Sequence, residues 1–248
     1  MLSEQQLQTF RRDGHVTVED VFDSTVITQA RRDVETWADE FLREMRDDQK
    51  TWYLERETSQ PGTLRKLDNP VFHRPFFRDL ARSPNLVSSV EQLIGSGVCV
   101  FFSQVFMKPA GGGGPKPIHQ DNFYFGPDDP DATLTVWIAI DDATTDNGCL
   151  FYGDGSHRLP VISHVAPPGE PFNLQVPETE AAKFIMTAAP VRAGGVSFHH
   201  GNTLHQSSAN LSGKSRRAIA MHFLRNNALL QHPTLKYDKA VRVSITAD

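Results

Sequence analysis

The sequence Ile118-His119-Gln120-Asp121 follows a run of glycines and prolines at positions 110–117. That run is too rich in Gly and Pro to form a helix or a central strand, so we expect an extended segment here. Side chains alternate along an extended chain, which places His119 and Asp121 on one side of the backbone and Gln120 on the other. An imidazole and a carboxylate on the same side can bind one metal ion together.

A His-x-Asp pair supplies two of the three ligands of the 2-His-1-carboxylate facial triad, which binds Fe(II) in non-haem oxygenases. The pair alone is weak evidence, because 10 His and 30 acidic residues in 248 give about 10 × 30/248, or roughly one, His-x-acid pair by chance. The rest of the chain must therefore supply a third ligand and a co-substrate site.

The composition is that of a soluble globular protein, with 39% hydrophobic and 22% charged residues. The formal net charge of -5 argues against a nucleic-acid partner, because there is no excess of Lys and Arg to neutralise phosphates. Cys99 and Cys149 lie in apolar stretches and are expected to be reduced packing residues. No signal peptide is predicted, and the longest apolar run, Val98–Phe102, is too short to cross a membrane. We expect a cytoplasmic protein without membrane contact.

The order of the predicted elements places helices first and strands after them. Helices are predicted at 3–12, 24–45, 72–81 and 84–94, and strands at 15–18, 98–107, 133–140, 149–152, 196–200, 203–207 and 216–225. Residues 47–70 show no periodicity and are expected to be loop. No repeat or interior linker is visible, so we expect residues 1–248 to form a single domain.

Two of these strands have one apolar face and one mixed face. The apolar faces carry Leu134, Val136, Ile138 and Ile140 in one strand and Ile219, Met221 and Phe223 in the other. The mixed faces carry Thr133, Thr135, Trp137 and Ala139, and Arg216, Ala218, Ala220 and His222. This split is typical of a sheet with helices outside and a ligand cavity inside.

Spacing alone does not select the third metal ligand. The candidates are His157, His164, His199, His200, His205 and His222. His205 and Ser207 share one face of an extended run, and Arg216 follows 11 residues after His205. A guanidinium at that place can bind a carboxylate in bidentate fashion. His200 is the nearest competitor of His205 for the metal. Arg217 could replace Arg216 as the partner of a carboxylate, but Arg217 lies on the apolar face of its strand.

The wider pattern resembles the phytanoyl-CoA dioxygenase family of Fe(II)/2-oxoglutarate-dependent oxygenases. The resemblance extends from about residue 3 to 225, and its motifs stand in the family's order. They are Phe10-Arg11-Arg12-Asp13-Gly14-His15-Val16, His119-x-Asp121, Thr135-Val136-Trp137-Ile138-Ala139, Asp146-Asn147-Gly148-Cys149-Leu150, Gly155-Ser156-His157, His205 and Arg216.

The resemblance implies a mainly β fold, namely a double-stranded β-helix (jelly-roll, cupin-like) core with flanking α-helices. The implied Fe(II) ligands are His119, Asp121 and His205. The implied co-substrate site, in which Arg216 pairs with the distal carboxylate of 2-oxoglutarate, contains Arg216, Ser207, Trp137 and Gln104. The family often has Phe where His199 stands, so the pair His199-His200 is a departure from its pattern.

The implied reaction consumes 2-oxoglutarate and O2, releases succinate and CO2, and hydroxylates a C–H bond of a small organic substrate. A carboxylate at Asp121 favours hydroxylation over halogenation, since related halogenases have a small non-ligating residue there. The alternative is a catalytically idle cupin-like protein that binds or senses the metal and 2-oxoglutarate.

The substrate and the oligomeric state are not determined by the sequence. An acyl-CoA, a natural product or an amino-acid-like molecule all fit. The basic residues that could meet the phosphates of an acyl-CoA are Arg65, Lys66, Arg74, Arg78 and Arg82. Residues 158–182 lack periodicity but are too apolar for a solvated linker, so we expect a mobile cover on the substrate side of the iron, away from Arg216.

Overall fold

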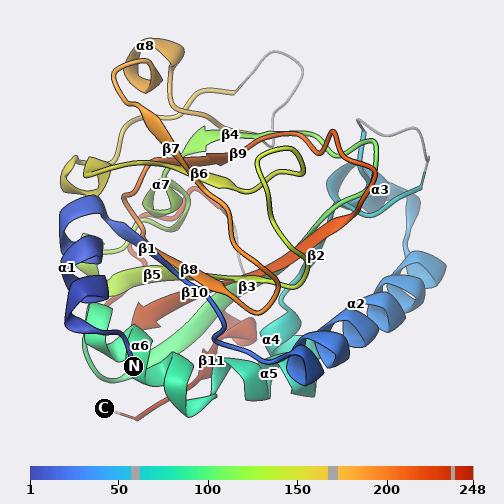
Figure 1. The fold of residues 1–248 in the computed structure, drawn as a ribbon, viewed down its shortest axis with the longest axis horizontal. Coiled ribbons are helices and arrows are strands. Elements are labelled where there is room, and N and C mark those ends of the chain that lie inside the picture. The colour runs from blue at the N-terminus through green and yellow to red at the C-terminus, as the bar shows by residue number, and fades with distance from the viewer. Residues whose placement is uncertain (57–61, 167–172, 236–237, 248) are drawn as a thin grey trace.

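The structure is a computed structural model that describes residues 1–56, 62–166, 173–235 and 238–247. Two antiparallel sheets face each other across its centre (Figure 1). The larger sheet has the order β1 (His15–Val18), β8 (Val196–His200), β5 (Thr133–Ala139), β10 (Arg216–Arg225), β3 (Val98–Lys108) and β11 (Val243–Ser244), and β2 (Lys66–Asp68) also pairs with β3. The smaller sheet has the order β4 (Lys116–His119), β9 (His205–Ser207), β6 (Leu150–Gly153) and β7 (Met186–Ala189).

Helices cover the outer face of the larger sheet, on the side away from the smaller sheet (Figure 1). They are α1 (Glu4–Asp13), α2 (Ser24–Glu44), α4 (Pro70–His73), α5 (Pro75–Ala81) and α6 (Pro84–Ile94). Three short helices, α3 (Asp47–Tyr53), α7 (Asp121–Phe125) and α8 (Glu178–Ala181), lie elsewhere. Local chemistry sets their starts. Ser3 forms a capping box with Gln6, and Asp23 accepts from the amides of Thr25 and Val26. The mainly β fold with flanking helices, a jelly roll, is confirmed.

The apolar faces of β5 and β10 form the main core with the helices. Leu134, Val136, Ile138, Ile219, Met221 and Phe223 are all buried in one cluster with residues of α2, α5 and α6. The predicted division of these strands into an outer apolar face and an inner mixed face is confirmed, since alternate residues of a strand point to opposite sides.

The inner face of the larger sheet has a floor of small side chains. Ala218 of β10 pairs with Phe106 of β3, and Ala220 pairs with Gln104. On the other side of β10, Ala220 pairs with Trp137 of β5. Ala220 therefore lies between the larger Gln104 and Trp137 and leaves space above the middle of the sheet, and it lines the cavity described below.

The structure differs from the sequence prediction in the region before β3. Residues 47–70 were expected to be loop, but they contain α3 and β2, and β2 is ordered by pairing with β3. The predicted helix 72–81 is divided into α4 and α5 at Arg74, which has an extended backbone (φ -120°, ψ 117°). Pro75 explains this break, because a residue before proline is disfavoured in the helical region. Within the described ranges, no helix is long and apolar enough to span a membrane.

Candidate active site

Three potential metal ligands meet between the two sheets. His119 ends β4, His205 begins β9, and these two residues are paired across the strands. Asp121 is the first residue of α7, since the chain turns into a helix directly after the strand. Its Oδ1 lies 3.7 Å from Nε2 of each histidine. The three ligand atoms lie within 4.8 Å of one another and form the single cluster of potential metal ligands found in the described part of the chain.

Backbone carbonyls set the tautomer of both histidines. His119 Nδ1 lies 2.8 Å from the carbonyl oxygen of Pro117, and His205 Nδ1 lies 2.9 Å from that of Thr203. A ring nitrogen that faces a carbonyl oxygen must carry the proton and donate, so each Nε2 keeps a lone pair for a metal. Burial also lowers the pKa of His119 well below its ordinary value, which keeps its ring neutral.

The second carboxylate oxygen of Asp121 is already engaged. Thr135 Oγ1 donates to Oδ2 at 2.5 Å, and His199 Nε2 lies 3.2 Å from the same oxygen. Burial by itself raises the pKa of Asp121, but the imidazoles of His205, His199 and His222 outweigh it and hold this pKa well below the usual range. Asp121 is therefore a carboxylate with Oδ1 left for a monodentate metal bond.

His199 and His222 surround this carboxylate. Tyr152 Oη lies 3.0 Å from His199 Nδ1, so when Nε2 donates to Asp121 the tyrosine donates to Nδ1. His222 Nδ1 lies 2.9 Å from Thr135 Oγ1, which accepts there because its proton goes to Asp121. Burial lowers the pKa of His199 to about 3 and that of His222 to about 4, so both rings are neutral hydrogen-bonding groups.

The nearest competing histidine is directed elsewhere. His200 Nε2 lies 3.0 Å from Asp131 Oδ1, and His200 does not line the cavity. His157, another candidate for the third metal ligand, lies against His200 with ring centroids 5.7 Å apart and is also outside the cavity wall.

Gly201 holds the ligand segment in place. Its carbonyl accepts from the amide of Asn122, the residue after Asp121, at 2.9 Å. A Cβ on Gly201 would overlap Asn122 Oδ1 and Thr133 Oγ1, which are hydrogen-bonded to each other at 2.5 Å. Replacement by alanine would push this buried pair apart and displace Asp121.

We expect Gly201→Ala to lower the free energy of unfolding by about 1–3 kcal/mol, the usual range for overpacking a buried site. Urea denaturation would measure this change. Gly213→Ala is the matched control, because a Cβ there has nothing within 4 Å. If both variants had the same free energy of unfolding, the Asn122–Thr133 pair would have room for a Cβ at Gly201, and the expected overlap would be wrong.

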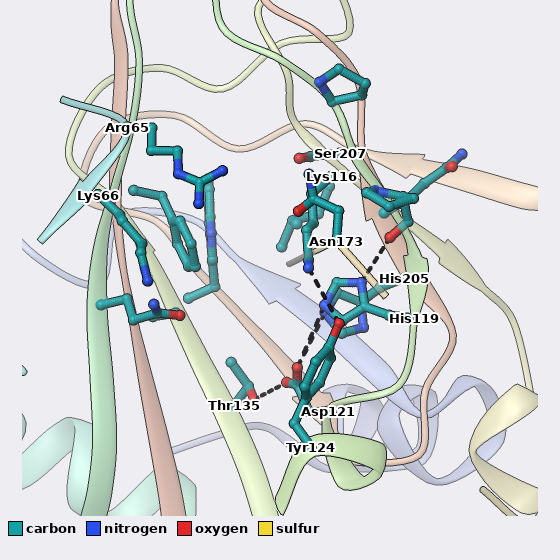
Figure 2. A pocket seen from close by; sticks show the side chains of 18 of the residues that line it. Arg65, Lys66, Lys116, His119, Asp121, Tyr124, Thr135, Asn173, His205 and Ser207 are labelled. Atoms are coloured by element: carbon teal, nitrogen blue, oxygen red, sulfur yellow. Dashed lines mark hydrogen bonds and ion pairs between the residues drawn. The ribbon is translucent and has the colours of Figure 1, made fainter. Parts of the chain in front are cut away.

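The seven residues predicted for metal and co-substrate line one cavity of about 410 Å³. They are Gln104, His119, Asp121, Trp137, His205, Ser207 and Arg216. Figure 2 shows the side chains of His119, His205 and Asp121 directed toward one another. Ser207 lies two residues after His205 on β9. Gln104 lies on β3, where its Nε2 donates to Asp68 at 2.7 Å.

Arg216 is a buried cation in the cavity wall. It is 2% exposed, its guanidinium carbon lies 5.5 Å from the ring centroid of Trp137, and its Nε and Nη1 have no hydrogen-bond partner. Burial lowers its pKa to about 10. Arg217 points to the other side of the sheet and bonds to Asp141 at 2.7 Å and to Glu35 at 2.6 Å. An unpaired buried guanidinium is costly, so the site fits a ligand carboxylate.

Several cavity residues were not singled out from the sequence. Thr135 was noted on a mixed strand face and in a family motif, and His222 also as a candidate third metal ligand, but neither was expected beside Asp121. Trp52 lies in the supposed loop. Of the five basic residues considered for phosphates, Arg65 and Lys66 line the cavity. The others bond elsewhere, namely Arg74 to Asp33 and Glu40, Arg78 to the carbonyls of Val71 and Phe72, and Arg82 to the carbonyl of Ser244.

The described parts of residues 158–182 pack against the metal-ligand segment. His164 Nε2 accepts from the amide of Gln120 at 2.9 Å, and the amide of Val176 donates to Ile118 at 2.9 Å. Asn173 and Gln175 line the cavity. Residues 167–172 lie outside the described residues, and a mobile cover stays a prediction.

A jelly roll with a His-x-Asp and His cluster beside a buried arginine has the architecture of the Fe(II)/2-oxoglutarate oxygenase class. The family model for phytanoyl-CoA dioxygenase (PhyH) matches residues 10–218, so the chain belongs to this family, as its sequence motifs predict.

Relatives and solved structures agree with this membership. The chain is 35% identical over 159 residues to "Phytanoyl-CoA dioxygenase domain-containing protein 1" of Rattus norvegicus, and the match covers 61% of this chain and 54% of that protein. The chain thus spans about half the length of this curated relative. Its fold is similar to EctD from S. alaskensis with bound Fe (TM-score 0.78, 19% identity, 100% and 87% of the two chains). It is also similar to the epimerase SnoN in complex with Fe3+, alpha ketoglutarate and nogalamycin RO (TM-score 0.70, 22% identity, 95% and 92%).

Proposed function

We propose that residues 1–248 form a single Fe(II)- and 2-oxoglutarate-dependent dioxygenase domain that hydroxylates a C–H bond of a small organic substrate. The observation that carries this proposal is the presence, in one cavity, of a three-ligand cluster and an unpaired buried arginine. Each feature by itself is compatible with proteins of several classes. Together they match a metal and a carboxylate-bearing co-substrate bound side by side.

The donor set fits Fe(II). Two neutral imidazoles with their Nε2 atoms available, and one carboxylate with Oδ1 available, would hold the metal and leave its remaining positions to 2-oxoglutarate and O2. When bound, iron supplies the oxidative chemistry that converts 2-oxoglutarate and O2 to succinate and CO2 and oxidises the substrate.

The chain's own residues would bind the co-substrate and orient the metal ligands. Arg216 would pair with the distal carboxylate of 2-oxoglutarate, and Ser207 and Trp137 would flank it. Thr135 and His199 hold Asp121 Oδ2 and so keep Oδ1 directed at the metal. A carboxylate ligand at this position supports hydroxylation, because a halogenase leaves that metal position to chloride.

The alternative is a binding or sensing protein that holds the metal and 2-oxoglutarate without turnover. The distinguishing experiment incubates the protein with Fe(II), 2-oxoglutarate and O2, measures succinate, and then adds pools of small molecules. A dioxygenase is expected to release succinate, and to release more of it when a substrate is present. Binding of 2-oxoglutarate by calorimetry without succinate release from any pool would favour the sensing protein.

The partner is proposed to be a small molecule, which the cavity volume and the small ligands in the SnoN structure support. Location in the cytoplasm stays a prediction.

A further inference from the structure

Gln120, the residue between the metal ligands His119 and Asp121, is fully buried and lies outside the cavity lining. Its side chain bonds to two other parts of the chain. Its Nε2 donates to the carbonyl oxygen of Asn202 at 2.9 Å, and its Oε1 accepts from the amide of Ile162 at 2.8 Å. The residue that joins two metal ligands is therefore held by groups 82 and 42 residues away in the sequence.

His164 binds the backbone amide of Gln120. Its Nδ1 lies 2.7 Å from the carbonyl oxygen of Ile162, so Nδ1 carries the proton and Nε2 accepts from the amide at 2.9 Å. Its ring stacks on Phe123 of α7, with centroids 4.0 Å apart and an angle of 9° between the planes. Burial lowers the pKa of His164 to about 4, which keeps the ring neutral, as an acceptor at Nε2 requires. His164, a candidate metal ligand in the sequence, is thus bound to the backbone between two ligands.

Asn202 connects this arrangement to the segment of the third ligand. It is 6% exposed and lies three residues before His205. Its Oδ1 accepts from Asn122 Nδ2 at 2.8 Å, and its Nδ2 donates to the carbonyl oxygen of Leu159 at 3.0 Å. Residues 159–164 therefore bond to both of the segments that carry metal ligands.

These bonds affect what a metal ion must order when it binds. Fixing the backbone of one residue costs about 1–2 kcal/mol of conformational entropy. If residues 159–164 already hold Gln120, the neighbouring ligands are ordered before the metal arrives, and its affinity is higher. Such a coupling is reciprocal, so a bound metal must stabilise the docked position of residues 159–164 by the same factor.

We propose that His164 is a positioning residue for the metal site, and that residues 159–164 form a supporting segment whose docking against Gln120 and metal binding favour each other. The supporting segment is then a fixed part of the site and does not belong to a mobile cover. The inference rests on the proposed function only for the presence of a metal, and it can be tested without turnover.

The first test is hydrogen exchange, followed by mass spectrometry, on the wild-type full chain with and without saturating Mn(II), in the absence of O2. Mn(II) is expected to slow exchange in the supporting segment about tenfold, which corresponds to about 1.4 kcal/mol. The control is the exposed end of α2, residues 41–44, whose amides exchange by local fraying and should not respond to the metal.

Variants assign the coupling to His164. His164→Leu removes the acceptor, so it is expected to weaken Mn(II) binding about tenfold and to abolish the effect of Mn(II) on exchange in the supporting segment. His164→Gln offers Oε1 near the position of Nε2 and is expected to bind Mn(II) within about threefold of the wild type. His73→Leu is the matched control and should keep the wild-type affinity, because His73 lies in α4, outside the cavity.

Three results would overturn the proposal: no effect of Mn(II) on exchange in the supporting segment of the wild type, wild-type affinity in His164→Leu, or equal losses in His164→Leu and His164→Gln. Equal losses would assign the effect to packing on Phe123. The exchange experiment on the wild type decides even where a variant does not fold.

Succinate release is scored separately from metal binding and exchange. A coupled supporting segment in a protein that never forms succinate would contradict the dioxygenase and leave the inference intact. Succinate formation without any coupling would contradict the inference alone.

Discussion

Alanine in place of His119, Asp121 or His205 is expected to abolish Fe(II)-dependent succinate formation, with a loss of more than about 100-fold. Each residue offers one of the three atoms of the cluster, and within the described ranges no other His, Cys, Asp or Glu joins it. Changes to groups that only orient metal ligands cost 10–100-fold in metal affinity or activity, so loss of a ligand should cost more. Succinate is measured at saturating 2-oxoglutarate, and iron content in parallel.

His200→Ala is the matched control for these variants. His200 is also buried and close in sequence to His205, but its Nε2 faces Asp131. We expect it to keep most of the activity. If His205→Ala kept its activity while His200→Ala lost it, the assignment of the third ligand would be wrong.

Arg216→Lys is expected to raise the KM for 2-oxoglutarate by roughly 10- to 100-fold, which corresponds to about 1.4–2.8 kcal/mol. The guanidinium is buried beside Trp137 without a hydrogen-bond partner for Nε or Nη1. A carboxylate there would receive two parallel hydrogen bonds, whereas a lysine offers a point charge on a shorter reach. Iron binding should change little, because Arg216 is outside the ligand cluster.

Arg217→Lys makes the same chemical change on the opposite face of β10. Arg217 is paired with Asp141 and Glu35, away from the cavity, so its variant should keep the wild-type KM. A raised KM in Arg217→Lys beside an unchanged one in Arg216→Lys would reverse the assignment of the two faces.

The sequence by itself determined the features that depend on near neighbours in the chain. The alternation in β5 and β10 predicted which residues face the helices, because a strand repeats every two residues. The predicted helices 3–12 and 24–45 begin within one residue of α1 and α2, because the caps of these helices, Ser3 and Asp23, form local hydrogen bonds. Family motifs in their usual order indicated the family, which the family model shows, and through it the jelly roll, which the two antiparallel sheets form.

Tertiary structure alone decided the features that depend on distant partners. β2 is a strand because it pairs with β3, about 40 residues later, and nothing in the local pattern of residues 47–70 signals it. The places of His199 and His222 around Asp121 follow from the register of β5 with β8 and β10. Lys66 faces the cavity because of the register in which β2 pairs with β3. Strand pairing across long separations is set by the whole packed core, and a single stretch of sequence carries little of that information.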